Sequence, residues 1–83
     1  MEHITEKAIR IFAKYYQEKY DILLSHSDIH IAWFSKTLQN WKAMIITMKD
    51  VMGGYYYEVT YNGDKKETYI DVYKKQDNVT IPD

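Results

Sequence analysis

Cysteine is absent from this chain. Its absence excludes disulfide bridges and cysteine-ligated zinc, which are the usual supports of very small secreted domains. A reducing cytoplasm therefore fits the sequence best. Long apolar runs are absent as well: the longest span a few residues, such as 43–46, whereas a membrane helix needs about 20. No basic-then-apolar leader opens the chain, so we expect neither a membrane span nor a secretion signal.

A strong net charge is also missing. Eleven basic and twelve acidic side chains give a formal charge of -1, so no strong field gathers or repels phosphate groups. Arg10 is the single arginine. Neutralising a phosphate backbone normally requires a basic stripe, and this composition therefore argues against nucleic acid as the partner.

The chain is rich in apolar and aromatic residues. Hydrophobic residues make up 46% of the chain, a share that suits a globular domain. A chain of 83 residues is too short to form two hydrophobic cores, so we expect one domain. Nine tyrosines, four methionines and two tryptophans favour half-buried sheets and interfaces. We expect a single domain over 1–83, with a helix at 4–21, a sheet at 29–75 and a loosely held tail at 76–83.

The N-terminal segment has the period of an amphipathic helix. Apolar residues recur there at steps of three and four, which places a wide stripe on one side of a helix of about five turns. The cluster at 25–28 ends this pattern and predicts a loop. The stripe comprises Ala8, Ile9, Phe12, Ala13, Tyr16 and Tyr20.

From Ile29 the period changes to two, which indicates strands. Residues 36–40 then predict a reversing loop, 41–48 a second strand and 49–54 a break. In the first strand, Ile31, Trp33 and Ser35 are expected on one face, and His30, Ala32 and Phe34 on the other.

The stretch 55–75 contains two alternating, tyrosine-rich runs around Asn62-Gly63-Asp64, the pattern of a β-hairpin whose turn needs positive φ. A two-residue loop at Gly63-Asp64 would place Val59 opposite Thr68 and keep like charges apart. The expected core face then comprises Tyr55, Tyr57, Val59, Ile70 and Val72, and the outward face Tyr56, Glu58, Thr60, Glu67, Tyr69, Asp71 and Tyr73.

These elements predict the fold class. Short connections favour a meander, and the helix must bury its stripe against one face of the sheet. We expect an α+β domain in which one N-terminal helix packs on an antiparallel sheet of three to four strands. This order resembles cystatin-like folds in topology alone, so no inhibitor activity follows from it.

Three segments are similar to a known group of sequences. Residues 36–43 (KTLQNWKA), 56–66 (YYEVTYNGDKK) and 69–75 (YIDVYKK) resemble a family of small uncharacterised proteins from phages and prophages of Gram-positive bacteria. The resemblance covers 29–82. Members often carry Cys where this chain has Ser35, so a thiol role is not available. The resemblance implies a phage-encoded protein in the host bacterial cytoplasm and supplies no catalytic residue, cofactor or substrate.

The histidines are weak candidates for a metal site. His26 and His30 are four apart with Asp28 between them, and in an extended chain they lie about 13 Å apart, too far for one small ion. We therefore expect no metal and no cofactor.

Carboxylates are the candidates for catalysis. Glu58, Glu67 and Asp71 share the outward face with tyrosines, and paired acids among aromatic rings can hydrolyse sugars. A flat, exposed face has no cleft that would raise the pKa of one acid, so we expect a protein without enzymatic activity. A small enzyme is the less favoured alternative.

Exposed aromatic residues on a sheet suit two kinds of partner. Single-stranded nucleic acid could stack its bases on them, with Lys36, Lys42 and Lys49 nearby; this is the alternative. The leading hypothesis is a non-enzymatic phage accessory protein that binds a host or phage protein, for example to block a bacterial defence. A homodimer is one way to cover the patch. The expected partner-binding residues are Trp41, Tyr56, Glu58, Tyr69, Asp71 and Tyr73.

Overall fold

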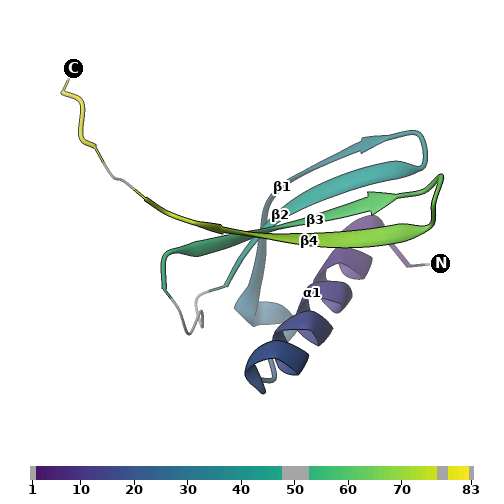
Figure 1. The fold of residues 1–83 in the computed structure, drawn as a ribbon, viewed down its shortest axis with the longest axis horizontal. Helices are drawn as coiled ribbons and strands as arrows, with labels where there is room; N and C mark the ends of the chain where they lie inside the picture. Colours follow the sequence, from purple (N-terminus) through teal and green to yellow (C-terminus); the bar gives the residue numbers. More distant parts are fainter. Residues whose placement is uncertain (1, 48–52, 77–78, 83) are drawn as a thin grey trace.

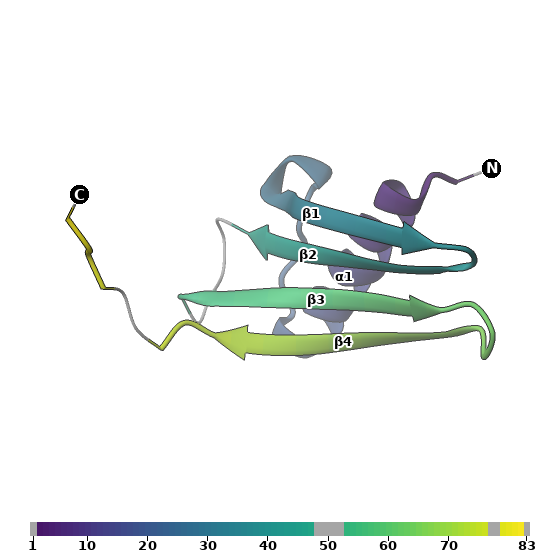
Figure 2. The ribbon, with the colours of Figure 1, turned by 90° about the horizontal axis from the view of Figure 1, so that it is seen from above.

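The computed structural model describes residues 2–47, 53–76 and 79–82. Within them the chain forms one α-helix, a short 3-10 turn and four strands that lie in the order β1-β2-β3-β4, each antiparallel to its neighbour (Figure 1). The helix lies behind the sheet in Figure 2, so it packs on one face only. The expected α+β fold is confirmed. The elements are α1 (Ile4–Tyr20), the 3-10 turn (His26–Asp28), β1 (Ile29–Thr37), β2 (Asn40–Thr47), β3 (Tyr55–Asn62) and β4 (Glu67–Lys74).

Local interactions set the two ends of α1. At its start, the His3 imidazole accepts a hydrogen bond from the backbone N–H of Thr5 at 3.1 Å, which caps the helix. At its end, Asp21 takes a left-handed conformation (φ 56°), and its N–H donates to the Gln17 carbonyl at 2.9 Å. The helix ends one residue before the predicted limit of 21.

The core lies between α1 and the sheet. Phe12 is at its centre: its ring centroid is 4.8 Å from that of Tyr57 on β3 and 5.6 Å from that of Tyr16. All three rings are fully buried. Burying a large apolar side chain stabilises a fold by about 1.5–3 kcal/mol, so this cluster holds the helix on the sheet. The buried apolar residues are Ala8, Phe12, Tyr16, Leu24, Ile29, Trp41, Ala43, Ile45, Tyr57 and Val59.

A bulge in β1 changes which of its side chains face the helix. Ile31 pairs with Ile45, and the next pair is Trp33 with Met44, so Ala32 is an extra residue. Ile31 therefore faces the helix, whereas Trp33 points to the other side. The prediction that Ile31 and Trp33 share a face is wrong, because a strict period of two does not reveal an inserted residue.

The hairpin of β3 and β4 has the predicted faces but a different register. Val59 lies opposite Ile70, and the predicted pairing of Val59 with Thr68 is wrong. The shift is two residues, an even number, so every side chain keeps its face. On the helix side of β4, Val72 is 41% exposed because α1 packs mainly against β1 and β2.

A four-residue loop joins these strands in place of the predicted two-residue one. The Asn62 side-chain oxygen accepts hydrogen bonds from the backbone N–H groups of Asp64 (3.1 Å) and Lys65 (3.2 Å), which stabilises the longer turn. The left-handed residue is Lys66 (φ 54°), not Gly63. Gly63 serves a different purpose, since a Cβ there would overlap the neighbouring turn between β1 and β2.

The predicted loop at 36–40 is shorter in the structure. The turn occupies 38–39 alone, because Lys36 and Thr37 pair as the end of β1 and Asn40 begins β2. Residue 48 of the predicted second strand and residues 49–52 of the predicted break lie outside the described residues; Gly53 and Gly54 are left-handed and lead into β3. In the tail, Gln76 and 79–82 are exposed and form no helix or strand, and the remainder lies outside the described part. The one helix of the described chain lacks the length and apolar character to cross a membrane.

Candidate binding face on the uncovered side of the sheet

The two sides of the sheet have different surroundings. Successive residues of a strand point to opposite sides, so those that alternate with the core residues form a second face, away from α1. Within 2–47, 53–76 and 79–82, no helix or strand packs on this side (Figure 2). We call it the open face. Its residues include Trp33, Ser35 and Thr37 on β1, Lys42 on β2, Tyr56, Glu58 and Thr60 on β3, and Glu67, Tyr69, Asp71 and Tyr73 on β4.

Aromatic rings occupy both ends of the open face. Tyr56 and Tyr73 are cross-strand neighbours whose rings stack with centroids 5.1 Å apart and planes 13° apart. Trp33, Tyr69 and Tyr73 are 42%, 43% and 39% exposed, respectively. Rings held by a sheet and open to solvent offer a large contact area at a small entropic cost.

Charged side chains cross the middle of the open face. Lys42 and Glu58 form an ion pair with an N–O distance of 3.1 Å. Asp71 on β4 lies opposite Glu58. Like charges in direct opposition destabilise paired strands, and the Lys42 ammonium offsets this repulsion. Together with Glu67, these residues give the open face one cation and three carboxylates.

Two tyrosines respond to this negative charge. The pKa of Tyr73 is raised above its ordinary value, first by the Glu58 carboxylate and then by desolvation and by Asp71. The pKa of Tyr69 is raised mainly because its hydroxyl donates a hydrogen bond to the Glu67 carboxylate. Both phenols therefore stay protonated at neutral pH, and the hydroxyl of Tyr69 is already directed at a carboxylate.

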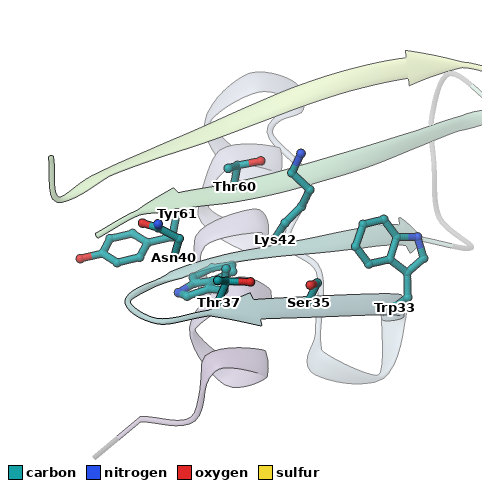
Figure 3. A pocket seen from close by; sticks show the side chains of 8 residues that line it. Trp33, Ser35, Thr37, Asn40, Lys42, Thr60 and Tyr61 are labelled. Atoms are coloured by element: carbon teal, nitrogen blue, oxygen red, sulfur yellow. The ribbon is translucent and has the colours of Figure 1, made fainter. Parts of the chain in front are cut away.

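A shallow hollow of about 350 Å³ lies on the open face over β1, β2 and β3 (Figure 3). Ser35, Thr37 and Thr60 contribute hydroxyls and Lys42 an ammonium group, and Trp33 stands at one end. The hollow thus combines hydrogen-bond donors and acceptors with one ring. Such a lining can accept a polar or aromatic side chain of a partner.

Trp41, the sixth predicted partner-binding residue, lines the hollow but is buried rather than exposed on this face. It pairs with Tyr61, lies on the helix side and is 5% exposed. Its ring stacks on that of Tyr61, with centroids 5.7 Å apart. The other five predicted partner-binding residues, Tyr56, Glu58, Tyr69, Asp71 and Tyr73, all lie on the open face.

Sequence reasoning missed the β1 and β2 part of this face. Lys42 alternates with the buried residues of β2, and that signal could have placed it here. Trp33 and Ser35 could not have been placed, because the bulge before them reverses the alternation of β1.

The residues considered for a metal lie near the start of β1, and His30, which pairs with Ile46, shares the open face. His26, in the 3-10 turn, and His30, at the start of β1, are exposed. Asp28 accepts hydrogen bonds from the backbone N–H and the hydroxyl of Ser25, both at 2.9 Å. Over the described ranges, no group of three or more His, Cys, Asp and Glu side chains could hold a metal ion.

The fold and the open face define a class: a small α+β domain whose four-stranded meander is covered by a helix on one side. Comparison with family models assigns the chain more narrowly. Residues 5–83 match the model of DUF6275, a family of unknown function, and the chain belongs to it. Searches of curated proteins and of solved structures found no match.

Proposed function

We propose that this protein is a non-enzymatic phage accessory protein that acts in the host bacterial cytoplasm by binding a host or phage protein through the open face. One observation carries the proposal: exposed rings and a shallow hollow share the side of the sheet on which none of the described elements packs. Aromatic residues surrounded by charge are typical of binding hot spots. Inhibition of a host or defence protein would be one use of such a surface.

The charges of the open face indicate what the partner offers in return. Lys42 is paired with Glu58, which leaves Glu67 and Asp71 as the excess negative charge. A basic partner surface would complement them, and like charges would be rejected. The same excess disfavours the alternative partner, single-stranded nucleic acid, although rings on a sheet are the feature that would stack bases.

The origin in a phage rests on the resemblance of residues 29–82 to phage and prophage proteins. Absence of catalysis is proposed from the shape of the face. The acids Glu58, Glu67 and Asp71 lie on an open sheet surface, and the hollow on that surface is shallow, whereas substrate sites are usually enclosed.

Two adjacent residues of β1 provide a matched test. Trp33 and Phe34 are 42% and 47% exposed and point to opposite sides of the sheet. Tagged protein is used to capture partners from nuclease-treated host lysate, and the bound proteins are identified by mass spectrometry. Trp33→Ala and Tyr69→Ala should lose the captured protein, whereas Phe34→Ala should keep it. Capture of no protein by the wild type, or equal loss with Phe34→Ala, would refute the proposal.

A binding assay with labelled single-stranded oligonucleotides distinguishes the proposed protein-binding function from the alternative, nucleic-acid binding. We expect no binding even at low salt. Salt-sensitive binding that is abolished by Lys42→Glu would instead establish the nucleic-acid function.

A further inference from the structure

The two edges of the sheet, β1 and β4, differ in how they are protected. The bulge at Ala32 interrupts β1, and bulges are one means by which natural edges avoid pairing with another chain. β4 pairs with β3 without any shift, contains no proline and carries one charged residue, Asp71, between its ends. In the described part of the chain no strand lies beyond β4. Its outer backbone groups therefore form a regular, unprotected template for a further strand.

We infer that two copies of this chain pair through β4, antiparallel and related by a two-fold axis, into one continuous sheet. Ile70 lies at the centre, opposite Ile70 of the second copy. An interface of this kind is isologous, since the same strand serves both copies.

The sequence of β4 selects this register. In a two-fold antiparallel pair, one residue, the centre, lies opposite its own copy, and paired residues share a face of the sheet. Only a centre at Ile70, which pairs residues 67–73, or at Asp71, which pairs residues 68–74, uses nearly the whole of β4. A centre at Asp71 would line up four carboxylates across the sheet, because Glu58 already faces Asp71 within each copy. A centre at Ile70 places Asp71 opposite Tyr69 and Glu67 opposite Tyr73. Each carboxylate of β4 then faces a phenol rather than another carboxylate.

The same register adds apolar contacts on the helix side of β4. Ile70 is half-buried and Val72 is 41% exposed in the single chain. Pairing brings Ile70 against its copy and Val72 against Thr68 of the second copy, so both gain cross-strand neighbours. The open face stays free and becomes twice as wide. The inference therefore does not depend on the proposed function, and either can fail without the other.

Cysteine cross-linking tests the register directly, because the wild-type chain has no cysteine. Residues in direct opposition have Cα atoms about 4.5–5.5 Å apart, within reach of a disulfide. Ile70→Cys should form a covalent dimer under mild oxidation. Val72→Cys alone should not, because the two cysteines would lie four residues apart, about 13 Å at 3.3 Å per residue. A mixture of Val72→Cys and Thr68→Cys should cross-link again.

Mass in solution, from chromatography with light scattering, provides the second measurement. The wild type should have twice the mass of one chain. Ile70→Lys, which opposes two ammonium groups, should have the single mass, and Phe34→Lys on the β1 edge should remain dimeric. Circular dichroism verifies folding, and if Ile70→Lys does not fold, the cross-links decide. A wild type with the mass of one chain at every concentration overturns the inference, as does cross-linking of Asp71→Cys in preference to Ile70→Cys.

Discussion

The two phenylalanines of the chain test how the helix covers the sheet. Phe12 on α1 is fully buried, whereas Phe34 on β1 is 47% exposed. Phe12→Ala and Phe34→Ala remove the same atoms. The difference between their effects on the free energy of unfolding therefore measures the difference in burial and packing.

The size of the expected effect follows from the contacts of Phe12. Truncating a buried Phe to Ala typically costs about 3–5 kcal/mol. Ring centroids of Tyr57, Tyr16 and Tyr15 lie 4.8, 5.6 and 6.2 Å from that of Phe12, and each such pair adds about 0.5–1.5 kcal/mol beyond area burial. We expect a loss of about 4–5 kcal/mol for Phe12→Ala and below about 1 kcal/mol for Phe34→Ala.

Such a loss is large for this chain. At about 0.05–0.15 kcal/mol per residue, a domain of this length is stable by about 4–12 kcal/mol. Phe12→Ala should therefore lower the melting temperature by about 16–40 °C, at about 4–8 °C per kcal/mol, or leave the chain unfolded. Thermal and urea unfolding, followed by circular dichroism, measure both variants. A loss below about 2 kcal/mol, or equal losses, would mean that α1 does not pack on this side of the sheet.

Three further changes test the turns and the open face. Gly63→Ala should cost about 1–3 kcal/mol in urea unfolding, because its Cβ would overlap the β1–β2 turn; a cost near zero would show that the two turns do not touch. Leu38 has a left-handed backbone (φ 57°) that strains a residue with a Cβ, so Leu38→Gly should raise stability by about 0.5–1 kcal/mol. Leu23 is about as exposed but is not left-handed, so Leu23→Gly should lower stability. Effects of the same sign in both variants would show that Leu38 is not strained. Glu58→Gln should bring the pKa of Tyr73 back towards about 10, as read by NMR titration of labelled tyrosine, and an unchanged titration would show that the Glu58 carboxylate does not raise this pKa.

The raised pKa of Tyr73 also makes the free energy of unfolding depend on pH at alkaline values. The folded state keeps the phenol proton to higher pH than the unfolded state does. The contribution of this group is therefore fully present below about pH 10 and is lost as pH rises through the folded pKa. Glu58→Gln should reduce this alkaline loss.

The sequence by itself determined the features that depend on local periodicity. The stripe that includes Phe12 and Tyr16 predicted α1 to within a residue, because a helix needs only its own spacing to place a side chain on one side. Alternation likewise placed Val59 and Tyr69 on the correct sides of β3 and β4, even though the predicted register was shifted by two. An even shift leaves the faces unchanged.

Tertiary structure decided which side of the sheet is covered and how the strands align. The side on which Trp33 lies depends on the bulge at Ala32, which the alternation of apolar residues along β1 does not reveal. The four-residue loop depends on contacts between turns far apart in sequence: the Gly63 N–H donates to the Asn40 side chain at 2.8 Å, and Gln39 donates to Asp64. In the observed register of β3 and β4, Glu58 lies directly opposite Asp71 despite their like charge. This pairing is tolerated because Lys42, from β2, forms an ion pair with Glu58. Each of these outcomes depends on residues that the chain brings together only when all four strands have paired, and a pattern within one strand does not contain them.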